Sequence, residues 1–340
     1  MVRVTPLRWA GVVTALLALF VLVMVVSASI GAVRIPPGAV FRSIFPWFGG
    51  GGTHGLIIRE VRLPRVILAG LVGASLATSG AVFQALLRNP LADPYILGVS
   101  GGGALGAILA MAVGVDFTLW GFSSVPIFSF LGSLCTIFFV YAVGSTGGRM
   151  ATQTLLLTGV IVNAIFSALI MFITSVVDFN QVQSIVFWLM GNLSTIGYGT
   201  LLKLSTYSLI GLVALFSLAR DLNALSLGEE QALQLGVDVE RTKKLAFVGA
   251  SLITGAVVSV SGLIGFVGLI VPHAVRLIFG PDHRLLLPAS MLCGGMFLMA
   301  ADTVARTVLS PVELPVGVIT AMCGGPFFIW LLKRRGSRVI

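Results

Sequence analysis

Charged side chains are scarce in this sequence. Only 10% of its 340 residues are Asp, Glu, Lys or Arg, whereas 57% are hydrophobic; a soluble domain carries about 25% charged residues. This imbalance excludes an ordinary soluble domain and predicts a polytopic membrane protein. The net charge of +9 does not indicate binding to nucleic acid, because no basic helix or basic run with interleaved aromatics is present. Cationic residues at membrane edges explain the excess.

Motifs for catalysis and nucleotide binding are also missing. The sequence has no GxxxxGK[ST] or HExxH pattern and no carboxylate pair placed for catalysis in an apolar segment, so we expect no catalytic residues and no bound nucleotide, metal or other cofactor. Cys135, Cys293 and Cys323 lie in apolar segments without CxxC or Cys/His spacing, which is typical of packed side chains. No chain of ionisable residues crosses the apolar segments as in a proton relay. If this protein moves a substrate, the energy comes from another chain.

Apolar segments long enough to cross a bilayer, about 20 residues each, occur ten times. We place these spans near residues 9–32, 63–87, 94–114, 121–144, 151–175, 200–219, 243–262, 264–280, 285–309 and 315–332. Residues 179–199 are apolar but rich in Gln, Asn and Gly, and we expect a partly membrane-embedded helix or loop there. The predicted fold is one all-α transmembrane domain over residues 1–340.

The Lys and Arg distribution predicts the orientation. An even number of spans puts both termini on one side, and fourteen cationic residues then fall on that side against seven on the other. Both termini are therefore predicted to be cytoplasmic, together with the charged loop at about 220–244. Five cations crowd one external loop with only Glu60 to oppose them. They are Arg34, Arg42, Arg59, Arg62 and Arg65.

A short repeat relates the two halves. Residues 72–78 read VGASLAT and residues 248–254 read VGASLIT, in the second and seventh spans. These copies are five crossings apart, and an odd number of crossings reverses direction. The pattern predicts inverted repeats of spans 2–5 and 7–10, a common transporter architecture.

Glycines in the third span predict close helix packing. Gly98, Gly102 and Gly106 recur every four residues and form a small-residue ridge. Gly101, Gly103 and Gly106 also spell GxGxxG, but no strand precedes them and no βαβ unit surrounds them, so this is not a dinucleotide site.

The charged loop contains the pattern of a short helix. Ser226 and Glu229 stand in capping-box register, Glu230 adds negative charge to the first turn, and Gly236 follows at the usual stop position. We predict a helix of about nine residues, roughly 13 Å long, which is too short to span a bilayer. It is either a solvated connector or a contact for another protein.

Two polar features stand inside apolar segments. Asp302 and Arg306 are four residues apart near the outer end of the ninth span, which predicts an intrahelical ion pair. His273 follows Pro272 at the cytoplasmic end of the eighth span, and we interpret it as a structural, hydrogen-bonded residue.

Taken together, these segments resemble the permease subunits of FecCD-type, binding-protein-dependent ABC importers for ferric siderophores, haem and cobalamin. The resemblance covers nearly the whole chain. Its motifs are RLPR at 62–65, SGAVFQALLRNPLADPYILGVSGGGALGA at 79–107, LGEEQALQLGV at 227–237, GFVGLIVPHAVRLIFGPDHRLLLP at 265–288 and ADTVARTVLSPVELPVGVITAMCGGPFFIWLL at 301–332.

This resemblance implies a type II ABC importer permease fold of ten helices per subunit, in a homodimer in the bacterial cytoplasmic membrane. It implies three kinds of partner: two ATP-binding subunits that use ATP and magnesium, a periplasmic or lipid-anchored substrate-binding protein, and a metal-chelate substrate. Iron chelates, as siderophore or haem, are the first expectation and cobalamin is the alternative. A secondary transporter would share inverted repeats but should show ionisable coupling residues in its spans. A membrane enzyme would need a convergent catalytic set.

The resemblance also implies roles for particular residues. The ATPase-coupling element corresponds to Ser226, Leu227, Gly228, Glu229, Glu230, Ala232, Leu235 and Gly236. The cytoplasmic gate corresponds to Asn89, Leu91, Thr152 and Gln153, although Gln153 is bulkier than the small hydroxyl residue expected there. Docking of the binding protein corresponds to Arg62, Arg65 and Arg306.

Overall fold

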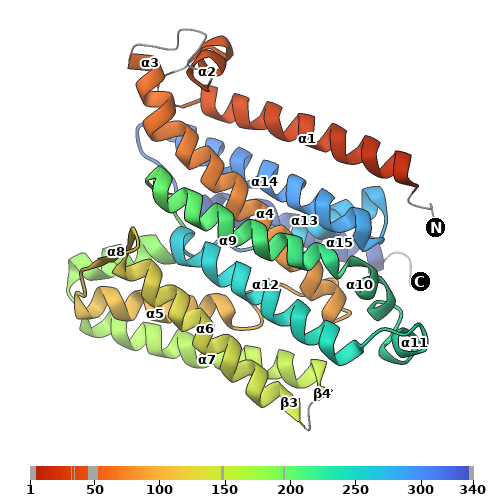
Figure 1. The fold of residues 1–340 in the computed structure, drawn as a ribbon. Helices are drawn as coiled ribbons and strands as arrows, with labels where there is room; N and C mark the ends of the chain where they lie inside the picture. The colour runs from red at the N-terminus through yellow and green to blue at the C-terminus, as the bar shows by residue number, and fades with distance from the viewer. Residues whose placement is uncertain are drawn as a thin grey trace.

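Helices make up almost all of the regular structure. The computed structural model describes residues 5–31, 33, 35–44, 53–146, 149–193 and 196–336 (Figure 1). In chain order the helices are α1 (Pro6–Ser29), α2 (Pro37–Ile44), α3 (Thr53–Leu56), the π-helical η2 (Ile57–Arg62), α4 (Leu63–Leu86), α5 (Val99–Val113), α6 (Ser124–Gly144), α7 (Thr152–Val176), α8 (Phe179–Leu189), α9 (Tyr198–Ser217), α10 (Ala219–Leu225), α11 (Glu229–Gln234), α12 (Val239–Ser261), α13 (Val267–Phe279), α14 (His283–Thr307) and α15 (Val316–Gly336).

Each of the ten predicted spans contains a helix, namely α1, α4, α5, α6, α7, α9, α12, α13, α14 and α15. Among the described residues, seven helices are long and apolar enough to cross a membrane. The apolar parts of α5, α13 and α15 are shorter. The prediction of an all-helical, multi-span protein is therefore confirmed.

The third and eighth spans begin later than predicted. We expected helix from residues 94 and 264, but α5 begins at Val99 and α13 at Val267. Their 15 and 13 residues extend about 22 and 20 Å, less than the bilayer core of about 30 Å. Left-handed backbone precedes each helix: φ is +79° at Gly98 and +70° at Phe266. Helices shortened at corresponding positions of two halves are typical of an inverted-repeat transporter.

The predicted repeat falls at matching places in α4 and α12. VGASLAT begins at residue 72, nine after the start of α4 at 63, and VGASLIT begins at 248, nine after the start of α12 at 239. The two helices pack on each other, and the Ser79 hydroxyl donates to the Ala250 carbonyl at 3.1 Å. They run in opposite directions, α4 starting beside α3 and α12 beside α11 (Figure 1). This arrangement supports inverted repeats.

Glycines set the closest helix crossings. α4 is central and packs on α9, α12, α13 and α14. A methyl group at Gly80 would lie 1.9 Å from the Gly268 carbonyl oxygen of α13, so only glycine fits where these backbones meet. The predicted ridge of α5 packs on α6, because a methyl group at Gly106 would lie 2.2 Å from the Phe128 carbonyl oxygen.

Residues 179–199 contain one short helix, α8. Asp178 caps it and forms a capping box with Gln181. After the helix, the Asn192 amide donates to the Ser261 carbonyl at the end of α12 at 2.8 Å. The expected helix is present, and its depth in the membrane stays a prediction.

Two small hairpins interrupt the helices. β1 (Thr118–Leu119) pairs with β2 (Phe122–Ser123), and β3 (Ser145–Thr146) pairs with β4 (Arg149–Met150), both antiparallel. The first turn, Trp120-Gly121, has φ of +53° and +80°, the pattern of a type I′ turn. A tryptophan at positive φ is unusual, and the sequence analysis did not predict either hairpin.

The bundle has two distinct ends (Figure 1). At the α11 end, the Trp9 indole donates to the Arg284 carbonyl at 2.9 Å and Asn223 of α10 bonds to Asp282. The start of α1, the turn between α13 and α14, and α10 therefore lie together. At the α3 end lie η2, the start of α4 and the close of α14. The predicted sites divide between these ends.

Candidate functional site

The short helix at the α11 end differs in detail from the prediction. α11 has six residues rather than nine, and its N-cap is Gly228, with φ of +131° and no side-chain cap. The predicted capping box is wrong: Ser226 ends α10 instead, and its hydroxyl donates back to the Leu222 carbonyl at 2.8 Å. The predicted stop is confirmed, since Gly236 follows the helix with φ of +80°.

Exposed leucines lie on this helix and directly beside its two ends. Leu227, Leu233 and Leu235 are 61–65% exposed, whereas Ala232 is fully buried against the bundle. Glu230 is exposed beside them. Three exposed leucines on one short element form a patch of the kind that binds another protein. The sequence analysis did not single out Leu233.

Glu229 turns inward and meets a buried lysine, Lys243 of α12. The Lys243 side chain is 2% exposed; its ammonium lies 3.1 Å from Glu229, 2.7 Å from Glu240 and 2.7 Å from the Met150 carbonyl oxygen. Glu240 in turn accepts from the Met150 amide at 2.7 Å. We call Glu229, Glu240 and Lys243 the lysine cluster. It joins α11, α12 and strand β4.

The first predicted gate segment is a tight turn after α4. Arg88 has φ of +47°, and Asn89 accepts from the Leu91 amide at 3.0 Å, which forms an Asx turn. Leu91 is 40% exposed. Arg88 lies 3.9 Å from Glu229, so this turn borders the lysine cluster.

The same turn holds a carboxyl group that the sequence analysis missed. Asp93 accepts from the Tyr95 amide at 2.8 Å. Burial raises the pKa of Asp93 to about 6, and the hydrogen bond from the Tyr95 amide opposes that shift in part. The group therefore titrates near neutral pH.

The second predicted gate segment opens α7. Thr152 is its first helical residue, and Gln153 is exposed next to it. Met150, two residues before Thr152, contacts both Lys243 and Glu240. Both predicted gate segments therefore border the lysine cluster, through Arg88 after α4 and through Met150 of β4.

A second tie connects the charged loop to the bundle. Asn223 of α10 donates to Asp282 and accepts from the His283 amide, each at 2.8 Å. Asp282 caps α14 and pairs with Arg284 at 2.6 Å. The Arg284 hydrogen bond, aided by Asn223, lowers the pKa of Asp282 to about 2. The carboxylate is therefore ionised at physiological pH.

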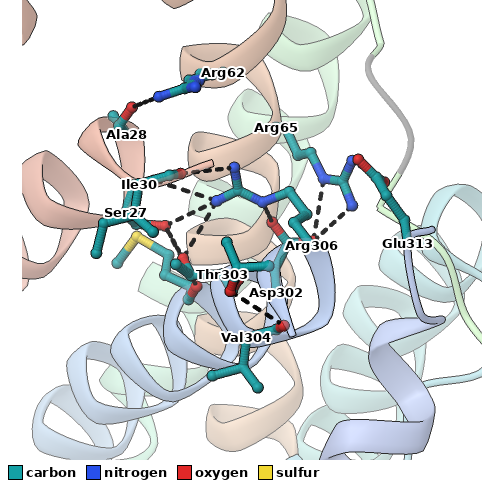
Figure 2. Close-up of polar contacts among 12 residues, drawn as sticks. Ser27, Ala28, Ile30, Arg62, Arg65, Asp302, Thr303, Val304, Arg306 and Glu313 are labelled. Atoms are coloured by element: carbon teal, nitrogen blue, oxygen red, sulfur yellow. Dashed lines mark hydrogen bonds and ion pairs between the residues drawn. The ribbon is translucent and has the colours of Figure 1, made fainter. Parts of the chain in front are cut away.

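The three predicted docking arginines lie together at the α3 end, but two of them point inward (Figure 2). Arg62 is 6% exposed and donates to the carbonyls of Ala28 and Ser29 at 2.9 and 3.1 Å, and to that of Val33. The Ala28 and Ser29 carbonyls close α1, whose C-terminus attracts positive charge. Arg62 therefore fastens α1 to α4.

Arg306 and Arg65 share one buried carboxylate. The predicted pair within α14 is confirmed, with Arg306 2.9 Å from Asp302, which is 1% exposed. Arg306 also donates to the carbonyls of Ser27 and Ile30 at 3.2 and 3.3 Å. Arg65 donates to Asp302 through Nε and Nη2 at 3.1 and 3.0 Å. We call Arg62, Arg65, Asp302 and Arg306 the arginine cluster.

Only Arg65 reaches the surface through a charged partner. Its Nη1 lies 2.7 Å from Glu313, whose side chain is 53% exposed. Glu313 follows α14 and was not predicted. Figure 2 shows Arg65 between the buried Asp302 and this glutamate. Arg34, which was grouped with these arginines in the sequence, lies outside the described residues.

The remaining polar predictions concern packing. His273 is 2% exposed and its ring packs edge-on against Phe327, which agrees with a structural residue. The three cysteines are free, but the prediction that they are packed is wrong for two of them: Cys135 and Cys323 are exposed, and Cys293 is half-buried. Among the described residues no group of three His, Cys, Asp or Glu side chains could hold a metal ion.

A many-span helical bundle with shortened third and eighth spans and a short exposed helix at one end defines the class: a type II ABC importer permease. Residues 18–334 match the FecCD transport family, and the chain belongs to this family. A solved inward-facing structure of a metal-chelate type ABC transporter has a TM-score of 0.81 and 34% identity, covering 96% of this chain and 99% of that one.

Curated relatives of the chain serve different substrates. It is 46% identical over 293 residues to the cobalamin import system permease protein BtuC of Halobacterium salinarum, covering 86% of this chain and 78% of that protein. It is 39% identical over 336 residues to the hemin transport system permease protein HmuU of Yersinia pestis, covering 98% and 97%. The chain is thus a multi-pass, non-catalytic permease subunit, and its family implies ATPase and binding-protein partners. The family match therefore excludes the two alternatives, a secondary transporter and a membrane enzyme.

Proposed function

We propose that this permease carries an iron chelate, a siderophore or haem, with cobalamin as the alternative. The named haem and cobalamin systems are both similar to this chain, so identity alone does not separate the two. Glycines and apolar side chains outnumber polar ones in α5 and α13, which we assign to the path. Such a path offers few groups to hold a ligand tightly, which suits a large chelate that a binding protein delivers.

The observation that carries the mechanism is the lysine cluster. A partner pushing on the exposed leucines of α11 would move Glu229, which contacts Lys243 and borders Arg88. Lys243 also holds the Met150 carbonyl beside the second gate segment. Because a buried cation that loses a carboxylate is costly, α11 and both gate segments are expected to move together. In this proposal, Lys243 transmits the ATPase stroke to the gate.

Orientation and assembly follow from this role. The α11 end faces the cytoplasm, where two ATPase subunits bind, and both termini lie on that side. A second copy completes the path along a two-fold axis. The exposed apolar face of α7, with Leu157, Ile161 and Phe172, is available to the second copy or to lipid. The gate is formed by Asn89, Leu91, Thr152 and Gln153.

Docking of the binding protein is assigned to the α3 end. Arg65 is anchored on Asp302 and presents its remaining edge to the exposed Glu313. A carboxylate on the binding protein could therefore replace Glu313 at this edge. Arg62 and Arg306 support the surface from beneath, because their donors already serve α1 carbonyls.

Reconstituted uptake tests the substrate. The permease, its cognate ATPase and its binding protein are placed in liposomes with a ferric siderophore, haem or cobalamin outside. ATP-dependent uptake of an iron chelate is expected. Uptake of cobalamin alone would select the alternative.

Cross-linking tests the gate. Leu91→Cys in both copies should form a disulfide across the two-fold axis in one nucleotide state and not in another. Equal cross-linking in every state, or none, would remove this turn from the gate. Leu227→Cys, on the coupling helix, serves as a control for exposure of the thiol.

A further inference from the structure

An apolar groove of about 610 Å³ lies outside the sites described above. α6 and α9 each pack on α12, and the groove runs between them with α12 as its floor. Phe130 and Leu131 of α6, Leu204 and Tyr207 of α9, and Ala256 of α12 line it. Its volume falls within the range of small-molecule sites, about 300–1,000 Å³.

The mouth of the groove lies at the α3 end and carries one positive charge. Lys203, in the second turn of α9, is exposed and donates to the Trp120 carbonyl at 2.5 Å. No ion pair among the described residues includes Lys203. An ammonium has three donors, so it can also bind an anion at the mouth. The β1–β2 turn is held in place there, because Thr200 donates to the Gly121 carbonyl at 2.8 Å.

The surfaces on either side of the groove face an apolar medium. On α6, Leu134 and Phe138 are exposed, and on α9, Leu209 and Ile210 are exposed. Trp120 is 80% exposed at the mouth, and tryptophan and tyrosine are enriched where a membrane meets water. The groove therefore opens between exposed apolar surfaces, with Trp120 and Lys203 together at its mouth.

We propose that this groove is a binding site for an anionic phospholipid, with an acyl chain along α12 and the phosphate at Lys203. Charge complementarity favours an anionic headgroup, because among the described residues Lys203 is the one charged side chain that lines the groove, and no carboxylate among them pairs with it. The apolar lining favours binding of an acyl chain. This assignment does not depend on which substrate the permease carries or on which side α11 faces.

Native mass spectrometry of the purified full-length chain tests the site. The protein in detergent is titrated with phosphatidylglycerol or, separately, with phosphatidylcholine. We expect tighter retention of phosphatidylglycerol, and about tenfold weaker retention by Lys203→Gln, as for loss of one charge-assisted hydrogen bond. Leu131→Trp, which fills the groove, should also weaken retention.

Matched variants separate the groove from general surface effects. Arg42→Gln removes an exposed cation at the same end, and Leu134→Trp adds the same bulk on the open face of α6; both should retain lipid as wild type does. If Lys203→Gln does not fold, the proposal is tested by comparing lipid retention in Leu131→Trp with lipid retention in Leu134→Trp. Quenching of Trp120 by brominated phosphatidylglycerol, measured against Trp120→Phe, gives a second readout.

Several results would overturn the proposal. Equal retention of the two lipids, or equal loss in the control variants, would show unspecific lipid contact. Protection against thermal unfolding by inorganic phosphate or glycerol phosphate alone would identify a free anion rather than a lipid. Loss of dimer in the Leu131→Trp variant, with bound lipid unchanged, would assign the groove to a second copy of the chain.

Discussion

The two ends of this permease each bury a charged side chain among partners of opposite sign, but the sign of the buried charge differs. At the α11 end, one buried lysine is neutralised by Glu229 and Glu240, each with 35–36% of its side chain exposed. At the α3 end, the buried group is the carboxylate of Asp302, which two arginines enclose. In the lysine cluster the cation is buried and the carboxylates are partly exposed to water, whereas in the arginine cluster the carboxylate is buried.

This difference has mechanical consequences. A lysine ammonium is a compact charge on a flexible stem, whereas an arginine guanidinium is a planar fork that fixes its partners. The lysine cluster joins three separate elements through partners that water can partly solvate, so they can move together. The arginine cluster also donates hydrogen bonds to the carbonyls that end α1, so it holds α1, α4 and α14 in one arrangement. We infer that the α11 end moves and the α3 end stays rigid.

Charge reversal in the arginine cluster should give the largest effect. Arg306→Glu places a second carboxylate beside the buried Asp302 and leaves α1 carbonyls without donors. Breaking a buried ion pair costs about 3–5 kcal/mol, so we expect a large fall in the melting temperature of the purified chain. Arg62→Glu should behave similarly.

Arg65→Glu is the matched variant for the same cluster. Arg65 also contacts the buried Asp302, but in this variant Asp302 keeps Arg306 and the other partner of Arg65, Glu313, is exposed. The melting temperature should therefore fall less than in Arg306→Glu, while docking of the binding protein should be lost and basal ATP hydrolysis kept. Docking of the wild type should also weaken with added salt. If Arg306→Glu melts like wild type and loses only docking, the rigid role assigned to the α3 end is wrong.

Lys243→Met sharpens the comparison at the other end. It leaves Glu229 and Glu240 without their cation, but both can take up water, so the cost should be smaller, at up to about 3 kcal/mol. Uptake should fall much further than stability, with ATP hydrolysis no longer stimulated by the loaded binding protein. Lys244→Met, which removes the exposed neighbour that lies over the Tyr141 ring at 5.5 Å, should keep most uptake. Equal uptake by the two variants would contradict the transmission role.

The sequence predicted where these charges lie along the chain, but not which of them are buried. Arg62, Arg65 and Arg306 were expected at a docking surface from the family resemblance, and Arg62 and Arg65 also belong to a loop rich in cations. Their burial depends on α1 ending against them, and hydropathy carries no information on that contact. Likewise, Lys243 opens the predicted seventh span, but the sequence analysis gave it no role. Glu240 is three residues away, whereas its other two partners are 14 and 93 positions away and are brought together only by the fold.

Local sequence patterns gave correct predictions where residues close in the sequence determine the structure. Gly236 was predicted from helix punctuation and has the left-handed backbone that punctuation implies. Ser226 failed because the same local rule fits two helices: it ends α10 instead of opening α11. The late starts of α5 and α13 were missed because their preceding segments are as apolar as the helices.

Gly236→Val should give a moderate effect at the moving end. A Cβ at this position would meet nothing within 4 Å, so the cost comes only from the left-handed backbone, about 1 kcal/mol or more. The complex should assemble, and ATP hydrolysis should be poorly coupled to uptake. Gly197→Val is the control, because Gly197 has equally open space and an ordinary φ of −62°. Full stimulation of hydrolysis by the loaded binding protein in Gly236→Val would contradict a coupling role for α11.

The smallest effect should come from Asp93, after the first predicted gate turn, where the pKa of its carboxyl group is raised to about 6 from 3.8. The folded chain then binds a proton more tightly than the unfolded chain, so ionised Asp93 lowers stability as pH rises from about 4 to about 6, and the full penalty persists above that range. Asp93→Asn keeps an oxygen for the Tyr95 amide and removes the charge. Its melting temperature should exceed that of wild type at pH 7.5, by no more than a few degrees because Asp93 is only partly buried, and the advantage should shrink at pH 4.5. Asp238→Asn, at the exposed start of α12, controls for loss of a carboxylate at this end. An advantage for Asp93→Asn that is constant with pH would show that burial of Asp93 does not govern its titration.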